Sequence, residues 1–368
     1  MGKIRMLSLD GGGVRGVITA YFISKLEKLT GKNANELFDY VTGTSVGGLN
    51  SAALFAPEGT PHYNASASNI VEMYENRGCD IFSESKWKYA ERTCGVFESK
   101  YSRDGLDKIA DEWFEGKTLN STDLPVSMHS YSLTYDEAKT WSTFSACKNT
   151  EDNILLKDSV GATTAAPTYF DPKQITGTGD YHVDGGMYAN NPVIAGYAEF
   201  KSHYTDYHAE DFIIVSFGTG EKEKPNYKVS EEDSMGLYEW VPKIIDVMFA
   251  SVDASIEKEA EEMFGENYYR FQPIIPKKDF TLDDASEESI ERLKEIAEDY
   301  YNKHKAEFEK VAKVLTQTEK TFHFDCGAEF VKDSYPMPEY IVCLDFTSEI
   351  STFGGEACFV NGSIDTWA

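Results

Sequence analysis

Residues 43–48, Gly-Thr-Ser-Val-Gly-Gly, carry the clearest indication of fold and chemistry in this chain. They follow an apolar-leaning run and lead into small and apolar residues, so they lie between an expected strand and an expected helix. Gly-x-Ser-x-Gly in this setting is the pattern of a nucleophile elbow, a turn so tight that Gly43 and Gly47 tolerate almost no side chain. The helix that follows would direct unpaired N–H groups toward the oxygen of Ser45. An ordinary glycine-rich turn accounts for the five residues equally well.

The composition is that of an acidic globular protein. The chain has 368 residues with a net charge of -27, and 41% of its residues are hydrophobic. This length is enough to bury one large core. Phosphate binding depends mostly on cationic side chains, so this charge is an argument against a nucleic-acid partner. Strong electrostatic docking on anionic lipid is not expected either, and a membrane substrate would be met through a local apolar or basic patch.

The N-terminus, the hydropathy and the cysteines predict a cytoplasmic protein without a membrane anchor, which could still contact membranes peripherally. The first apolar run is broken by charge and leads straight to Asp10, unlike a signal peptide. No run approaches the roughly 20 apolar residues of a membrane span. The six cysteines include no CxxC pair, so the sequence predicts neither a zinc site nor a dense disulfide framework. Reduced thiols are therefore the expectation.

The order of strand and helix patterns predicts an α/β fold. A short buried strand at 4–9 runs directly into a glycine-rich loop at 10–16, and a helix with one apolar face follows. A second strand at 40–41, the elbow and another helix complete a βαβα start, which is typical of parallel strands. Residues 212–217 form the clearest buried strand. We therefore expect a three-layer α/β/α sandwich around a mixed, mainly parallel sheet.

The second half of the chain predicts long helices and then a change of character. Helical patterns cover about 235–264 and 284–316, and the second has one continuous buried stripe. Short β-like runs follow, so we assign 1–318 to one domain and 319–368 to an appendage of unknown role. Within 79–102, an aromatic and locally basic stretch is interpreted either as a lid or lipid-contact surface or as a long connection packed by its own aromatic rings.

The glycine loop at 10–16 admits two interpretations. Gly11-x-Gly13-x-x-Gly16 after a strand matches a dinucleotide-binding fingerprint, which also requires an acidic residue near the end of the second strand. Asp39 precedes that strand, and the elbow occupies the required place. Alternatively, successive N–H groups of the loop form an oxyanion hole at a helix N-terminus. A second glycine loop that carries a serine favours the oxyanion hole.

A serine nucleophile needs a base, and the histidines are poor candidates. Of the seven histidines only His182 lies near a strand end, and a packed or hydrogen-bonded role suits it better. Two residues later, Asp184 and two glycines end the same strand, at the edge where parallel sheets place their chemistry. An aspartate followed by two glycines can approach another backbone closely. The alternative for Asp184 is a turn-capping role.

Taken together, these motifs resemble those of the patatin-like phospholipase family over about residues 1–318. The motifs keep the family's order and spacing: Asp-Gly-Gly-Gly-x-Arg-Gly at 10–16, Gly-Thr-Ser-x-Gly-Gly at 43–48, Ala-Thr-Thr-Ala-Ala-Pro-Thr-Tyr-Phe at 162–170, and Asp-Gly-Gly followed by Ala-Asn-Asn-Pro at 184–192. Shorter stretches at 216–220, 267–270 and 283–286 also look like the plant patatins. The last fifty residues match no pattern of the family.

The resemblance implies a lipid acyl hydrolase of the phospholipase A type that acts through a Ser–Asp dyad. Ser45 would attack an ester carbonyl while Asp184 takes its proton, and an acyl-enzyme would then be hydrolysed by water. An aspartate near its ordinary pKa of about 3.9 is a weak base, so we expect burial to raise the pKa of Asp184.

The oxyanion hole implied by the resemblance comprises the amides of Gly11, Gly12 and Gly13, with Arg15 nearby. No metal and no cofactor are expected. The implied partner is a phospholipid or another acyl lipid, met in transient contact with a membrane surface, and the oligomeric state stays open. The alternatives are a storage or binding protein with residual esterase activity, an effector lipase switched by a nucleotide signal, and a dinucleotide-dependent dehydrogenase.

Overall fold

The structure is a computed structural model of the whole chain. It describes residues 2–63, 65–82, 99–224 and 244–326, together with the backbone of two short strands near the C-terminus. These two strands, β11 (Cys358–Val360) and β12 (Ser363–Asp365), pair antiparallel. Residues 83–98, which hold most of the aromatic and basic stretch interpreted above as a lid or connection, lie outside the described residues.

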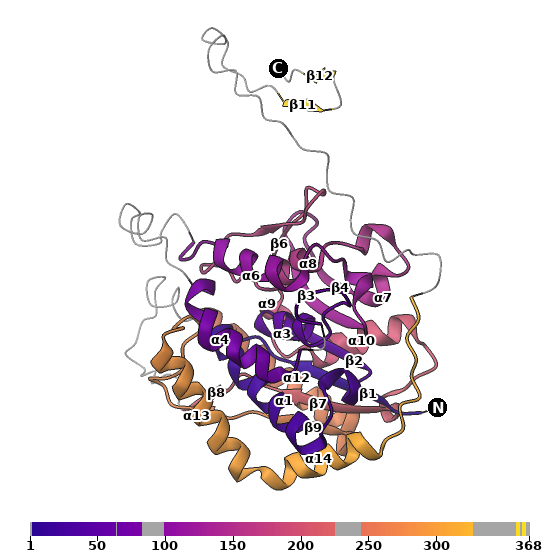
Figure 1. The fold of residues 1–368 in the computed structure, drawn as a ribbon, viewed down its shortest axis with the longest axis vertical. Coiled ribbons are helices and arrows are strands. Elements are labelled where there is room, and N and C mark those ends of the chain that lie inside the picture. The colour runs from indigo at the N-terminus through magenta and orange to yellow at the C-terminus, as the bar shows by residue number, and fades with distance from the viewer. Residues whose placement is uncertain are drawn as a thin grey trace, which may run out of the picture.

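An eight-stranded sheet forms the centre of the molecule (Figure 1). Its strands are β1 (Ile4–Leu9), β2 (Tyr40–Thr44), β3 (Val126–Ser132), β4 (Glu137–Ser142), β5 (Lys173–Gln174), β6 (Tyr181–Asp184), β7 (Phe212–Phe217) and β9 (Tyr268–Phe271). The order is β5-β6-β3-β2-β1-β7-β9, and β4 pairs with β3. Strands β3, β2, β1, β7 and β9 are parallel, whereas β4 and β6 run antiparallel to β3. The expectation of a mixed, mainly parallel sheet is confirmed.

Helices pack on both faces of this sheet and complete the three layers (Figure 1). They are α1 (Gly16–Thr30), α2 (Ala34–Leu37), α3 (Val46–Leu54), α4 (Ala67–Ile81), α6 (Asp104–Phe114), α7 (Thr143–Ala146), α8 (Leu156–Thr163), α9 (Gly186–Ala189), α10 (Val193–His203), α12 (Ile244–Phe264), α13 (Glu287–Lys303) and α14 (Lys305–Gln317). Within the described ranges, none of the helices combines the length and the apolar character that crossing a bilayer would require.

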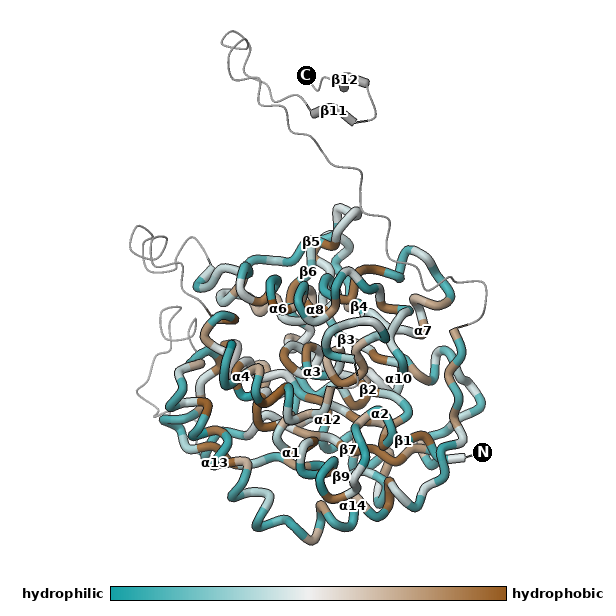
Figure 2. Tube along the Cα trace, viewed as in Figure 1, coloured by the Kyte–Doolittle hydropathy of each residue, from teal (hydrophilic) through white to brown (hydrophobic). Residues whose placement is uncertain are grey.

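The alternation of side chains along the central strands explains the two cores. In β1, Leu7 and Leu9 belong to the core beneath α1, α3 and α4, whereas Ile4 and Met6 belong to the core beneath α10 and α12. Because successive strand residues point to opposite faces, a strand that is apolar at every position feeds both layers. Figure 2 shows hydrophobic residues gathered toward the middle of the molecule and hydrophilic residues along the outer helices α13 and α14.

The helix expected over 284–316 is two helices, and this prediction was wrong in one respect. The chain leaves helical geometry at His304, with φ -109° and ψ 21°, so α13 ends and α14 begins there. The bend lets Phe308 pack among Phe22 and Phe271, with ring centroids 5.5 and 4.3 Å away. Burial of this aromatic cluster therefore outweighs the continuity of one amphipathic helix.

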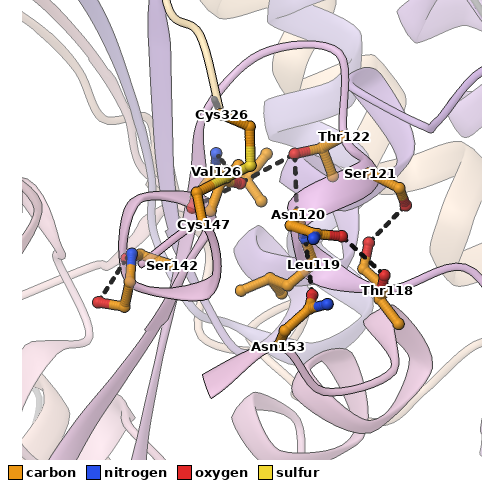
Figure 3. Close-up of a disulfide and its surroundings, with 12 residues drawn as sticks. Thr118, Leu119, Asn120, Ser121, Thr122, Val126, Ser142, Cys147, Asn153 and Cys326 are labelled. Atoms are coloured by element: carbon orange, nitrogen blue, oxygen red, sulfur yellow. Dashed lines mark hydrogen bonds between the residues drawn. A yellow bond between two sulfur atoms is a disulfide. The ribbon is translucent and has the colours of Figure 1, made fainter. Parts of the chain in front are cut away.

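Residues 319–326, which the sequence assigns to the appendage, pack against the main body. The Phe322 ring is buried between Phe200 and Tyr204, and each ring centroid lies 5.3 Å away. Beyond it, Cys326 forms a disulfide with Cys147, with Cα atoms 5.2 Å apart (Figure 3). Reduced thiols were therefore the wrong expectation for this pair. The two cysteines are 179 positions apart, so no local pattern in the sequence predicts that they meet.

Candidate active site

Ser45 lies at the apex of a strained turn between β2 and α3. Its backbone has φ 55° and ψ -127°, a conformation that a residue other than glycine adopts only where the surroundings enforce it. A Cβ atom on Gly43 would lie 2.3 Å from the Gly47 carbonyl oxygen, and one on Gly47 would lie 2.1 Å from the Leu9 carbonyl oxygen. Both positions require glycine, so the turn has the geometry of a nucleophile elbow.

The strained backbone of Ser45 is held by a hydrogen-bonded threonine. The Ser45 N–H donates to Thr163 Oγ1 at 2.9 Å, and the same hydroxyl donates to the His129 carbonyl oxygen at 2.6 Å. Thr163 is the last residue of α8 and is fully buried, so it connects the elbow to β3. This contact fixes the backbone of Ser45 through its N–H and does not involve the serine hydroxyl.

The carboxyl group of Asp184 is buried at the end of β6, with 1% of the residue exposed. Burial raises the pKa of Asp184 to about 7, against smaller opposing effects of the Ser45 hydroxyl and the Gly186 N–H. The Gly186 N–H donates to Oδ1 at 2.7 Å. Within the described chain, the buried Oδ2 accepts no hydrogen bond of regular geometry. The raised pKa expected from burial is confirmed, and Oδ2 is available to accept a proton.

Asp184 reaches the elbow from an antiparallel strand. In the register of β3 and β6, Asp184 lies opposite Ser130, and in that of β2 and β3, Thr44 lies opposite His129. Asp184 therefore stands one residue from the level at which β2 ends and the elbow begins. The sequence predicted that Asp184 lies at this edge of the sheet, on the assumption that its strand is parallel to the others. In the structure β6 runs antiparallel to β3.

The glycine loop at 10–16 lies beside the elbow, and only part of it has free amide groups. The Gly11 N–H donates to the Asn190 carbonyl oxygen at 3.0 Å. By contrast, the N–H groups of Gly12 and Gly13 donate no hydrogen bond to any described residue. A Cβ atom on Gly11 would lie 3.2 Å from the Ser45 Cβ, so the loop packs directly on the serine. The expected set of oxyanion donors therefore narrows to Gly12 and Gly13.

Arg15 lies behind this loop. Its Nε donates to the Gly12 carbonyl oxygen at 3.2 Å, and its Nη1 donates to the Gly220 carbonyl oxygen at 3.1 Å. The guanidinium carbon lies 3.8 Å from the centre of the Phe280 ring. Arg15 therefore holds the Gly12 carbonyl group of the loop and connects it to Gly220 after β7, which differs from the place beside the oxyanion that the sequence suggested.

Residues of the glycine loop line two cavities. The smaller has a volume of about 50 Å³ and is lined by Ser45, Asp184, Gly12 and Gly13 together with mostly apolar side chains, among them those of Leu49, Leu106, Phe170 and Leu282. The larger has a volume of about 630 Å³, and its lining includes Arg15 and Thr219. A serine hydroxyl, a carboxyl group and two glycine amides thus line one mostly apolar space, which is an arrangement compatible with acyl transfer.

The residues expected for the rival sites do not meet in this way. Asp39, the acidic residue considered for a dinucleotide site, is fully buried in an ion pair with Arg5, and its Oδ1 is 2.7 Å from Arg5 Nη2. His182 is hydrogen bonded to Ser130 and Asp180, as the sequence suggested. Among the described residues, no group of His, Cys, Asp and Glu side chains is arranged to hold a metal ion.

Sequence reasoning missed three polar residues that hold the site together. Thr163 anchors the elbow, Asn190 takes the Gly11 N–H, and Thr219 donates from Oγ1 to the Gly11 carbonyl oxygen at 2.6 Å. All three lie within stretches that carry the family resemblance, at 162–170, 184–192 and 216–220. Membership in those stretches was the available indication, but it assigns no contact to any one residue.

Comparison with known proteins identifies a family and several relatives. The family model described as patatin-like phospholipase matches residues 7–196. Patatin-like protein 4 of Arabidopsis thaliana is 29% identical over 332 residues, which cover 80% of this chain and 82% of that protein. The cGAMP-activated phospholipase of Vibrio cholerae is 28% identical over 83% of this chain and 93% of its own length. The mouse calcium-independent phospholipase A2-gamma is 26% identical over 86% of this chain and 41% of its own length.

The matched range contains both glycine loops, the elbow and the aspartate at the end of β6. It spans more than half of the chain and includes Ser45, Asp184, Gly12 and Gly13, which line the same cavity. The chain belongs to the patatin-like phospholipase family.

Proposed function

We propose that this protein hydrolyses fatty-acyl esters of glycerophospholipids or related lipids with Ser45 as nucleophile and Asp184 as base. The observation that carries the proposal is the shared cavity. A serine on a strained elbow and a buried carboxyl group, whose Oδ2 accepts no hydrogen bond of regular geometry, line the same mostly apolar space. The relatives named as phospholipases support the class of substrate.

The first half of the reaction acylates Ser45. Asp184 Oδ2 takes the hydroxyl proton of Ser45 as Oγ bonds to the ester carbonyl carbon. The negative charge that develops on the carbonyl oxygen faces the N–H groups of Gly12 and Gly13. The bond to the leaving alkoxide then breaks, and protonated Asp184 returns the proton to that oxygen. In the second half, Asp184 takes a proton from water as the water oxygen bonds to the acyl carbon. The bond between that carbon and Ser45 Oγ then breaks, Asp184 returns the proton to Oγ, and the fatty acid leaves.

The pKa of Asp184 suits this cycle. A base with a pKa of about 7 is about half ionised at pH 7 and mostly ionised at pH 8, and it is strong enough to take the serine proton in the transition state. It is also weak enough to give that proton to the leaving group. The same burial that raises the pKa keeps water out of the space around the nucleophile.

The apolar lining of the small cavity fits an acyl chain rather than a polar substrate. Its volume of about 50 Å³ is far below the roughly 300 Å³ at which ligand pockets begin. Binding of a long acyl chain therefore requires the walls to move apart. Phe82 and Phe170 belong to these walls, with ring centroids 6.0 Å apart, and Tyr169 and Leu282 complete this side.

Release of free fatty acid from mixed phospholipid vesicles tests the proposal. Ser45→Ala and Asp184→Asn should each lower the rate at least about 10³-fold, because each removes a member of the dyad. Ser202→Ala and Asp206→Asn are the matched controls, since both residues are exposed on the surface and neither lines the cavity. Full activity in either dyad variant, with the controls unchanged, would show that the dyad is assigned to the wrong residues.

The cellular location of the protein and its contact with membranes are also matters of proposal. The cytoplasmic location expected from the sequence and the Cys147–Cys326 disulfide point in opposite directions, because reducing systems keep disulfides rare in the cytosol. We propose transient contact with a membrane surface as the way in which the protein meets its substrate. The acidic net charge of -27 indicates that this contact is made through a local apolar or basic patch.

A further inference from the structure

We infer that Thr219 is a positioning residue that fixes the direction of the Gly12 N–H in the oxyanion hole. This inference rests on the proposed function. Thr219 follows β7 and is 3% exposed. Its Oγ1 lies 2.6 Å from the Gly11 carbonyl oxygen, to which it donates a hydrogen bond.

Peptide geometry connects this hydrogen bond to the oxyanion hole. In a trans peptide the C=O of one residue and the N–H of the next point in opposite directions within one plane. A partner that holds the Gly11 carbonyl oxygen therefore sets the direction of the Gly12 N–H on the other side of the loop. Arg15 does the same one residue later, because it holds the Gly12 carbonyl oxygen and thereby directs the Gly13 N–H.

The linings of the two cavities are consistent with Gly12 and Gly13 N–H groups that point toward Ser45. Thr219 and Arg15 line the large cavity, whereas Gly12 and Gly13 line the small cavity with Ser45. The partners of the loop carbonyls therefore line a different cavity from the one that Ser45 lines. Carbonyl groups that point toward Thr219 and Arg15 leave the two amide groups directed into the space where the ester would lie.

Close packing around Thr219 supports a fixed rather than a loose contact. A Cβ atom on Gly12 would lie 2.1 Å from Thr219 Oγ1, so no other residue fits between them. On the preceding peptide, the Gly11 N–H is taken by the Asn190 carbonyl oxygen at 3.0 Å. Gly11 is thus held at both its N–H and its C=O. The Gly12 N–H is therefore already oriented before the oxyanion forms, so no reorientation of this peptide is needed during the reaction.

Thr219→Val tests the inference, because valine keeps the shape of threonine and replaces the hydroxyl with a methyl group, which donates no hydrogen bond. Thr219→Ser is the matched control that keeps the hydroxyl. We expect kcat to fall about tenfold to hundredfold in Thr219→Val, which is less than the loss of a whole oxyanion donor, while KM stays within about threefold. Thr219→Ser should have a kcat close to that of the parent. This difference from Thr219→Val should remain even if both variants have the same lowered melting temperature, so a loss of stability would not explain it.

A second readout is the rate at which a fluorophosphonate probe labels Ser45. The phosphoryl oxygen of the probe enters the same hole as the ester oxygen, so labelling should slow in parallel with kcat, whatever the natural lipid is. Thr219→Ala replaces Thr219→Val if the valine variant fails to fold. Equal kcat and equal labelling rates in the valine, or alanine, and serine variants would overturn the inference. Labelling that survives Ser45→Ala would instead overturn the proposed function.

Discussion

Two groups of serine and aspartate side chains lie on neighbouring strands of this protein, and only one has the features of a reactive site. The first is Ser45 with Asp184. The second is a chain in which Ser130 Oγ lies 2.9 Å from His182 Nδ1 and His182 Nε2 lies 2.7 Å from Asp180 Oδ2. By residue type and connection, the second group matches a Ser–His–Asp triad better than the first group does.

The surroundings of the two serines differ in every physical respect that matters for attack on an ester. Ser130 lies within the regular strand β3, is fully buried, and its Oγ also accepts a hydrogen bond from Trp141 Nε1 at 3.0 Å. It does not line the small cavity. Ser45 has a strained backbone, is half-buried, and faces the cavity.

The two acids differ in the same way. Asp180 has both carboxylate oxygens occupied, one by His182 and the other by Ser132 Oγ at 2.7 Å. Asp184 keeps Oδ2 without a regular partner and has a raised pKa. A fully satisfied polar chain stabilises the fold, whereas a reactive site keeps one group unsatisfied at a cost in stability. A chain of hydrogen bonds between Ser, His and Asp side chains therefore does not by itself indicate a reactive site. A cavity beside the serine and an acceptor atom without a regular hydrogen bond are the more informative features.

The largest effect expected from this comparison is the response to a fluorophosphonate probe. The probe should label Ser45 to one equivalent per chain and should leave Ser130 unlabelled, since Ser130 has no access to the cavity. Peptide mapping by mass spectrometry identifies the labelled residue. Ser130→Ala should retain fatty-acid release within about threefold of the parent protein. Labelled Ser130 would remove the distinction between the groups, and absence of any label would favour a storage or binding role.

A smaller effect is expected on stability, with opposite signs for the two acids. Because the pKa of Asp184 is raised to about 7 in the folded protein, its contribution to stability is fully present below pH 4 and is lost as the pH rises through 7. At pH 8, Asp184→Asn should therefore unfold at a higher urea concentration than the parent, with a free energy of unfolding that is larger by up to about 4 kcal/mol. Near pH 4 the two proteins should differ little.

Asp180→Asn provides the contrast. It weakens hydrogen bonds to His182 and Ser132, so we expect a loss of about 1–3 kcal/mol at pH 8. Urea denaturation of both variants at two pH values measures the difference. If Asp184→Asn were destabilised at pH 8 as much as Asp180→Asn, then Asp184 would be a satisfied structural acid like its counterpart.

The smallest expected effect concerns the pH dependence of kcat/KM rather than a loss of activity. If Asp184 is the base, kcat/KM should rise with pH through about 7, so the value at pH 6 should be roughly a tenth of the value at pH 8. His182→Gln should keep this midpoint, because burial lowers the pKa of His182 and the residue lies outside the cavity. A midpoint that shifts or disappears in His182→Gln would transfer the role of base to the histidine.

Most of the fold and the central pair of residues could be predicted from the sequence because both depend on local patterns. The buried strands at the N-terminus, the elbow and the strand before Asp184 are each recognisable within about ten residues. The weakness of the histidines as candidates also followed from their local settings. The structure confirms the mixed, mainly parallel sheet, and it brings Ser45 and Asp184 to the same cavity.

The parts that sequence could not predict depend on contacts between distant segments. Whether the amide of Gly11 is free depends on Asn190, and the direction of the next peptide depends on Thr219, which is 208 positions away from Gly11. The direction of β6 and the break at His304 were likewise determined by packing against other elements rather than by propensity. Motifs therefore located the loop, but only the folded chain shows which of its amides are available.

The disulfide described above also gives the molecule a covalent topology. The bond between Cys147 and Cys326 closes a ring that contains Asp184 and Thr219, while Ser45 and the first glycine loop lie on the open chain outside it. A single protease cut anywhere inside the ring opens it without releasing a fragment. A label placed on Ser45 would therefore migrate with the piece that carries Asp184 until the disulfide is reduced, and separate from it afterwards whenever the cut lies before Asp184.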